Sequence, residues 1–200
     1  MIKTFSLVSA FILSLNVGPA LAADDVITWK DDVKGWYIGV DTTTGDLGDG
    51  CFMVTEYEGN TFLRLQIDPN FGNNFAVYVG DREWKSLEPG KFYPLEIIIG
   101  NQEPWVAEAE AIEWNDTTNA LVFHLSTEDD KAAVFVEEFM RYLGIEFFYE
   151  NQSIANLTLE GTYAATSELF ECALEMNDLN ASGGDDPFNI DRRDKNDPFS

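Results

Sequence analysis

The sequence predicts a mainly β domain of the α+β class, an antiparallel β-sandwich or flattened barrel of about nine strands with two helices in its C-terminal third. Between residues 35 and 126, short segments rich in aromatic and β-branched residues alternate with turns rich in Gly, Asn and Asp, which is the pattern of successive antiparallel strands. After residue 127, two segments repeat apolar residues at the period of a helix. A chain of 200 residues fits one domain.

The first four strands follow a mixed segment, residues 23–34, that we interpret as an extended arm. The run GWYIGV is rich in strand-forming residues and precedes a turn-rich loop. Glu58-Gly59-Asn60 then separates two strand patterns, as expected of a hairpin loop, and a polar break at 69–74 precedes the next. The strands predicted in this half are 35–40, 51–57, 61–67 and 75–79.

Three strands are predicted in the middle of the chain, at 92–99, 105–114 and 120–126. The first follows a Pro-Gly turn and ends in three isoleucines. The second, WVAEAEAIEW, is ambiguous because Ala and Glu favour a helix, but its strict alternation and its short length favour a strand. The third places Leu121, Phe123 and Leu125 on one face.

Two helices and two strands complete the predicted domain. An apolar stripe at helical spacing runs through 128–143, and Gly144 is suited to end this helix. Strands at 145–149 and 154–159 flank a polar turn. The last helix, 164–177, carries Leu169, Cys172 and Met176 on one face, so we expect Cys172 to point inward.

Residues 1–22 have the three parts of a secretory signal peptide. Lys3 supplies the positive charge, 5–17 form the apolar stretch, and Ala20 and Ala22 provide small residues for cleavage after Ala22. The apolar stretch is shorter than the ~20 residues of a membrane span, and the sequence has no second such run, so we expect no stable membrane insertion after its removal. The predicted location is the periplasm or the exterior of a Gram-negative bacterium, and the predicted domain occupies 23–180.

The two cysteines, Cys51 and Cys172, are predicted to form a disulfide. An even number of cysteines in an oxidising compartment favours pairing. The alternative is two buried thiols that act as small apolar side chains. Neither cysteine belongs to a Cys-x-x-Cys pair, so the sequence offers no redox motif.

Composition excludes several classes of function. With 36 acidic and 12 basic residues the formal net charge is −24, and such a surface repels phosphate backbones, so nucleic acid is not expected as a partner. The single histidine, His124, leaves no His-based zinc site and little basis for a Ser-His-Asp triad, and its place in a strand favours a structural role. No cofactor motif is present, so we predict no cofactor.

Carboxylates provide two candidate sites. Asp41, Asp46 and Asp49 lie in a Gly-rich loop and could bind a ligand or calcium, although the spacing differs from an EF-hand and a simple turn is the alternative. Glu108 and Glu110 would lie about 7 Å apart on one strand face. That distance lies within the roughly 5–9.5 Å of glycosidase carboxylate pairs, whereas a solvated strand face is the alternative.

Tryptophans provide a third candidate site. Exposed indole rings on secreted β domains hold sugars by stacking, and Trp side chains in small domains also fill cores. We therefore list as a possible aromatic binding platform Trp36, Trp84, Trp105 and Trp114.

Residues 181–200 are predicted to be a disordered acidic tail, because they hold few large apolar residues. The tripeptide Asp-Pro-Phe occurs twice there, so Phe188 and Phe199 could anchor the tail in the groove of a partner. The alternative is a tail that is fully solvated.

Several short motifs resemble a group of small secreted proteins that is common in alphaproteobacteria. They are Gly50-Cys-Phe-Met-Val, Trp84-Lys-Ser-Leu, Tyr93-Pro-Leu-Glu and Pro104-Trp105, and the resemblance spans about 35–176. The segment 157–165 (LTLEGTYAA) is also similar to the C-terminal strand and helix of the invasion-associated locus B family, which is periplasmic and β-rich. This chain has no equivalent of that family's additional cysteines. The resemblance implies an envelope location and a non-enzymatic role, and it assigns no functional residue.

The functional prediction is a non-enzymatic binding or accessory protein of the bacterial cell envelope, whose partner is an envelope protein or a glycan. A first alternative is an acidic proteinaceous inhibitor of a cationic, lysozyme-like hydrolase, because opposite charge steers association. A second alternative is a glycan-binding or carboxylate-based glycan-hydrolysing domain.

Overall fold

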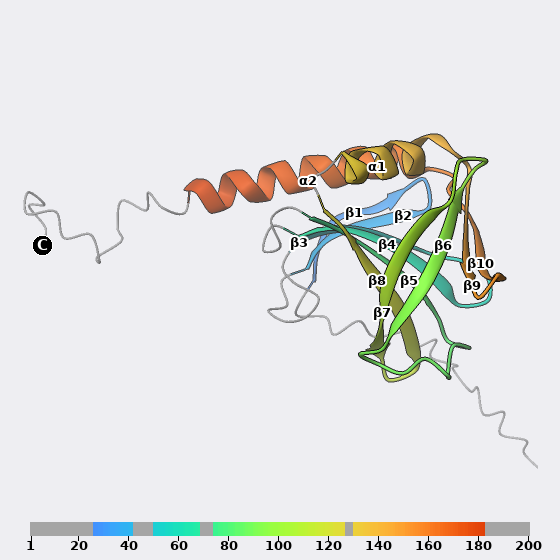
Figure 1. Ribbon diagram of the computed structural model, residues 1–200. Helices are drawn as coiled ribbons and strands as arrows, with labels where there is room; N and C mark the ends of the chain where they lie inside the picture. Colours follow the sequence, from blue (N-terminus) through green and yellow to red (C-terminus); the bar gives the residue numbers. More distant parts are fainter. Residues whose placement is uncertain (1–25, 42–49, 69–73, 127–129, 183–200) are drawn as a thin grey trace, which may run out of the picture.

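The computed structural model describes residues 26–41, 50–68, 74–126 and 130–182, which form ten strands and two helices (Figure 1). The predictions for the signal peptide and for the tail beyond residue 182 lie outside these residues. The elements in chain order are β1 (Val26–Val33), β2 (Trp36–Asp41), β3 (Gly50–Glu56), β4 (Thr61–Asp68), β5 (Asn74–Asp81), β6 (Phe92–Ile99), β7 (Trp105–Asn115), β8 (Thr118–Leu125), α1 (Lys131–Arg141), β9 (Gly144–Tyr149), β10 (Gln152–Thr158) and α2 (Thr162–Ser182).

All ten strands belong to one antiparallel sheet with the order β1-β2-β3-β4-β5-β8-β7-β6-β9-β10. The meanders β1–β5 and β6–β8 join where β5 pairs with β8, with Val77 opposite Phe123. The hairpin of β9 and β10 extends the sheet beyond β6. Within the described residues β1 and β10 are the two ends of the sheet, so it is flattened rather than closed. The predicted mainly β, antiparallel fold is therefore confirmed.

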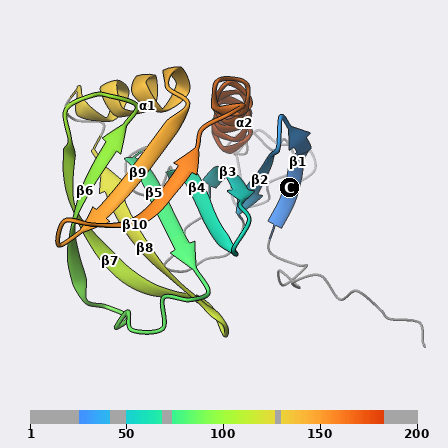
Figure 2. The same ribbon diagram turned by 90° about the vertical axis from the view of Figure 1, so that its right-hand side faces the viewer.

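One face of the sheet carries the main core, and both helices lie side by side on that face (Figures 1 and 2). Strand alternation sends residues such as Leu65, Val77 and Ile97 inward, where each is fully buried. Phe139 of α1 packs edge-on against Trp36 of β2, with 6.0 Å between ring centroids. The helical stripes predicted from sequence are thus the surfaces that cover the sheet.

The structure has one strand more than the nine predicted. It is β1, which lies where the sequence predicted an extended arm. β1 pairs with β2, but the register shifts between Thr28 and Lys30 and again between Lys30 and Val33. These irregularities replace simple alternation, so the less exposed side chains are Val26, Trp29 and Val33. The sequence of β1 therefore lacks the strict two-residue periodicity of a regular strand.

The ends of both helices differ from the prediction, and α2 continues to Ser182, five residues beyond its predicted end and into the first two residues of the predicted tail. α1 ends at Arg141 and the chain is already extended at Tyr142, so Gly144 begins β9 and does not terminate the helix. α2 begins at Thr162, two residues early, where the buried Thr162 hydroxyl lies 2.8 Å from the carbonyl oxygens of Leu159 and Phe139. This side chain joins the start of α2 to the end of α1.

A disulfide between Cys51 of β3 and Cys172 of α2 confirms the predicted pairing. The two Cα atoms lie 6.0 Å apart across a sequence separation of 121 residues, and both side chains are buried. As predicted, Cys172 faces inward beside Leu169. The bond therefore ties the C-terminal helix to the N-terminal half of the sheet.

Candidate functional site

The outward face of the sheet carries a second apolar cluster, separate from the main core. Alternate residues of five neighbouring strands, β3, β4, β5, β8 and β7, face outward here, and a row of aromatic rings lies among them. Phe62 and Trp114 lie 4.7 Å apart between ring centroids, and Tyr78 lies 5.6 Å from Trp114. The buried members are Phe62, Ala76, Tyr78, Ala120 and Val122, with Val54, Ile112 and Trp114 packed against them.

Arg64 of β4 is buried beside this cluster, where only 4% of its surface is exposed. One Nη2 donates to Asp41 Oδ2 at 2.7 Å and to Gln66 Oε1 at 2.6 Å, and Nε donates to the same Gln66 oxygen at 3.1 Å. The guanidinium is therefore held by a buried carboxylate and a buried amide, which are the partners that a buried cation requires.

Three aromatic rings surround the same guanidinium. The Arg64 Cζ lies 3.7 Å from the ring centroid of Phe52, 5.3 Å from Trp114 and 5.6 Å from Tyr78. Positions within about 6 Å of a ring face allow favourable cation–π attraction. Burial lowers the pKa of Arg64, while the hydrogen bond and the charge of Asp41 oppose this change. The buried Arg64 guanidinium thus packs against the aromatic rings and holds them in position.

A pocket of about 520 Å³ opens over this aromatic surface. Its size falls in the ~300–1,000 Å³ range of small-molecule sites. Five aromatic residues line it, and they are Trp36, Tyr37, Phe52, Phe62 and Trp114. The polar side chains of the lining come from β1, β3, the β3–β4 turn, β4, the residue after β5, and the β7–β8 hairpin. They are Asp31, Asp32, Thr55, Glu56, Asn60, Arg64, Arg82, Asn115 and Thr118.

Hydrogen bonds hold several of these polar side chains in place. Arg82 Nη1 donates to Asn60 Oδ1 at 3.0 Å, and the Gly35 N–H donates to Asp32 Oδ1 at 2.9 Å. Asn115 Oδ1 accepts from the Thr117 backbone N–H at 3.0 Å. We call this cavity, with its aromatic floor and polar rim, the outer-face pocket.

The structure separates the four predicted platform tryptophans. Trp36 is only 2% exposed and its Nε1 donates to the Glu160 carbonyl at 3.0 Å, so its ring belongs to the main core and offers no free face. Trp105 donates to Glu138 Oε2 at 2.7 Å and joins β7 to α1. Trp84 packs against the main core. The lining of the outer-face pocket includes Trp36 and Trp114, and of these two only Trp114 belongs to the outward cluster.

Sequence reasoning missed the other rings and the arginine of this pocket. The available signal was Arg64 itself, a single charge between Leu63 and Leu65 in an apolar strand. Such a charge must find a partner when the strand is buried. Its partner Asp41 belongs to a distant strand, and only the sheet order brings the two together.

The predicted Asp loop is described only at its first member. Asp41 is 3% exposed and accepts the hydrogen bond from Arg64, whose positive charge opposes a bound cation. Asp46 and Asp49 lie outside the described residues. Within the described ranges, no group of three or more His, Cys, Asp or Glu side chains is arranged to hold a metal ion.

The predicted carboxylate pair lies on β7, which is a strand as expected. Ala109 and Ala111 face the core, so Glu108 and Glu110 share the outward face. Neither glutamate lines the outer-face pocket or the groove described next. His124 is exposed on the outward face of β8 and lines neither cavity.

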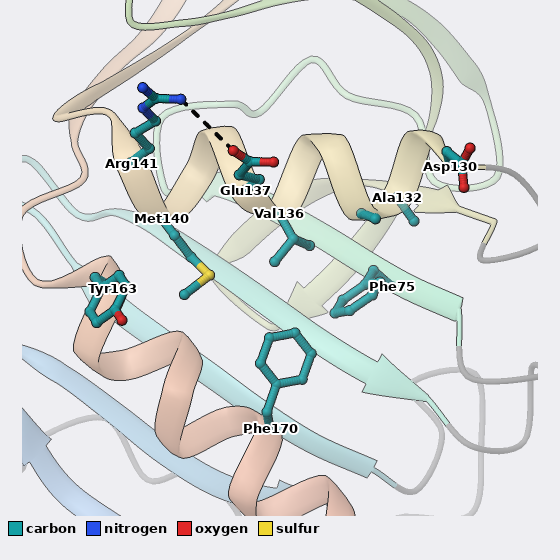
Figure 3. A pocket seen from close by; sticks show the side chains of 10 residues that line it. Phe75, Asp130, Ala132, Val136, Glu137, Met140, Arg141, Tyr163 and Phe170 are labelled. Atoms are coloured by element: carbon teal, nitrogen blue, oxygen red, sulfur yellow. Dashed lines mark ion pairs between the residues drawn. The ribbon is translucent and has the colours of Figure 1, made fainter.

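A second cavity, of about 620 Å³, is a groove between the two helices (Figure 3). Figure 3 shows Val136 and Met140 of α1 across from Tyr163 and Phe170 of α2, with Phe75 of β5 at the base. Phe75 and Phe170 meet edge-on with 6.1 Å between ring centroids. The lining is mainly apolar, and we call this cavity the helix groove.

No protein-family model and no curated protein matches this chain. A search of solved structures found the crystal structure of invasion associated protein B from Bartonella henselae, with a TM-score of 0.49 and 10% sequence identity. That similarity covers 74% of this chain and 98% of the other chain. At this level we transfer no residue role.

Neither helix in the described ranges combines the length and apolarity needed to cross a membrane. Phe188 and Phe199, the two aromatic residues of the predicted tail contact, lie outside those ranges.

Proposed function

We propose that this protein is a non-enzymatic binding protein of the bacterial cell envelope, and that its outer-face pocket holds a saccharide. One observation carries the proposal: an aromatic floor and a rim of mixed donors and acceptors form a single pocket of about 520 Å³. Sugar rings present both apolar C–H faces and hydroxyl edges. The ring faces of Tyr37 and Trp114, which are half-buried, suit the first property.

The polar rim suits the hydroxyl edges of a sugar. Hydroxyl groups both donate and accept, and the amides of Asn60 and Asn115 do the same. Arg82 adds donors, while Asp31 and Asp32 add acceptors. A small number of placed polar groups above an apolar surface is the usual composition of a small-molecule site.

A binding role is consistent with the ion pair between Arg64 and Asp41 in the wall of the pocket. Arg64 and Asp41 already neutralise one another at 2.7 Å, with both side chains buried. Their positions are fixed by Gln66 and by the rings around the guanidinium. This pair gives the pocket a rigid wall and is not arranged as an acid and a base across a cleft.

An extracytoplasmic location is part of the proposal. Disulfides persist in oxidising compartments and are rare in the cytosol. The bond between Cys51 and Cys172 supports that location. The signal-peptide pattern of residues 1–22 supports it independently.

The experiment is a binding titration of the disulfide-bonded protein with two probes, a chito-oligosaccharide and soluble peptidoglycan fragments. Trp114→Ala removes one wall of the pocket and should weaken binding at least tenfold, which corresponds to about 1.4 kcal/mol. Phe92→Ala is the matched control, because Phe92 is 58% exposed and lines neither cavity. Equal binding by both variants, or no binding of either probe by the unchanged protein, would contradict the proposal.

The charge favours inhibition of a cationic hydrolase as a second candidate function. The formal net charge is −24, and Asp31, Asp32 and Glu56 place three carboxylates in the lining of the outer-face pocket. A basic enzyme would be steered toward such a surface, and binding would weaken steeply with salt. Titration with a basic lysozyme at low and high salt tests this candidate, and an absence of binding at low salt contradicts it.

A further inference from the structure

The helix groove continues as an apolar stripe along α2. Tyr163, Phe170 and Leu174 are 70%, 37% and 66% exposed, and their spacing of i, i+7 and i+11 places them on one face of the helix. Figure 3 shows the first two at the groove. The stripe therefore runs from the groove toward Ser182, where α2 ends and the remaining chain begins.

We propose that the helix groove is a binding site for this chain's own C-terminal segment, residues 183–200. In this arrangement the segment returns along α2, Phe188 covers Leu174, and Phe199 enters the groove beside Met140. The proposal concerns a different surface from the outer-face pocket and does not depend on the proposed saccharide.

The length of the chain beyond α2 satisfies this arrangement. From Leu174 to Ser182 the helix rises about 12 Å, at 1.5 Å per residue. Six residues from Ser182 to Phe188 span up to about 20 Å when extended. Eleven further residues reach Phe199 and span up to about 36 Å, whereas Leu174 and Tyr163 are separated by about 16 Å of helix. Gly183 and Gly184 directly after α2 allow the chain to reverse.

Covering the stripe is favourable for the same reason that cores form. Large apolar side chains left in water have a free-energy cost that burial removes. The segment is tethered, so its local concentration at the groove is high even when its intrinsic affinity is modest. Two phenylalanines in identical Asp-Pro-Phe tripeptides supply the apolar groups.

The methyl signal of Met140 in an NMR spectrum tests the proposal in the full chain with its disulfide formed. Met140 lines the groove, whereas Met53 is fully buried in the main core and serves as an internal reference. Phe199→Ala should shift the Met140 signal, because it removes a neighbouring ring, and should leave Met53 in place. Phe92→Ala is the control and should shift neither signal.

The position of the second ring is tested by a further variant. Phe188→Ala should shift amide signals around Leu174, because it removes the ring that covers this side chain. A Met140 signal that is unchanged in both phenylalanine variants overturns the proposal. A Met140 signal that depends on protein concentration also overturns it, since that result assigns the groove to a second copy of the chain.

Discussion

Arg64 and Asp41 form a solvent-shielded ion pair on the outward face of the sheet, with 2.7 Å between Nη2 and Oδ2 and side chains only 5% and 4% exposed. The pair joins β4 to the end of β2, two strands that are not neighbours in the sheet. Phe52 of β3 lies between them in the sheet order and stacks on the guanidinium. The pair therefore fixes the wall of the outer-face pocket through three strands.

The first prediction follows from this burial. Asp41→Asn leaves the Arg64 charge without a counter-charge, and we expect a loss of about 3–5 kcal/mol in the free energy of unfolding, measured by urea denaturation. Glu137→Gln is the control, because its partner Arg141 lies 3.8 Å away and both side chains are about 70% exposed. The control should be nearly neutral. Equal stability of the two variants would contradict the account of Arg64 as a buried, dependent charge.

The second prediction concerns the disulfide between β3 and α2. The double variant Cys51→Ala/Cys172→Ala should lose up to about 5 kcal/mol, because the bond closes a loop of 121 residues and restricts the unfolded chain. Both cysteines are replaced so that no free thiol remains to react. Urea denaturation of this variant should match that of the reduced unchanged protein. If the double variant has the same free energy of unfolding as the oxidised protein, the disulfide does not stabilise the fold and the prediction is wrong.

The third prediction separates two effects at glycines. Gly161 has φ +85°, and a Cβ there would lie 2.6 Å from the Lys34 carbonyl oxygen, whereas Gly59 has φ +95° and open space around it. Both substitutions place alanine in a left-handed backbone conformation, which is unfavourable for a residue with a Cβ. Only Gly161→Ala also brings its Cβ into a clash with the Lys34 backbone. Gly161→Ala should therefore be the more destabilising by about 1–3 kcal/mol in thermal or urea unfolding. Equal losses would mean that α2 can shift away from the β1–β2 turn.

The fourth prediction is a pH dependence at Tyr57. Its hydroxyl donates to the Thr158 carbonyl at 2.7 Å, and burial raises its pKa well above the ordinary value of 10.0. Because the folded state keeps this proton longer than the unfolded state, the contribution of Tyr57 is complete below pH 10 and declines as pH rises above it. Tyr57→Phe should thus be less stable than the unchanged protein at pH 8, with a smaller difference at pH 11. A constant difference across this range would contradict a raised pKa of Tyr57 in the folded protein.

Regular alternation made most strands predictable from the sequence. β6 exposes every second side chain until its end, and β7 was identified as a strand from the alternation around Ala109 and Ala111 despite its helix-favouring composition. β1 was not identified as a strand from the sequence, because the register shifts on either side of Lys30 interrupt the two-residue period. The strand that the local pattern failed to predict is thus the one whose pairing is interrupted twice.

The outer-face pocket could not be predicted in the same way. Trp114 was a candidate, but so was Trp36, and the two rings differ only in the face of the sheet toward which they point. The pairing of Val54 with Arg64, and of Arg64 with Tyr78, sets the row of outward groups across three strands. Such lateral neighbours depend on sheet order and register, which a single sequence does not contain.

The most direct test of the saccharide proposal uses the five indole N–H signals of the protein in a titration with a chito-oligosaccharide or peptidoglycan fragments. Trp114 lines the outer-face pocket, whereas Trp36 and Trp105 donate their indole N–H groups to Glu160 and Glu138 elsewhere in the fold. We predict a saturable shift of the Trp114 signal with the other indole signals in place. A titration that saturates without moving Trp114, or that leaves all five signals unchanged, would contradict the assignment of this pocket.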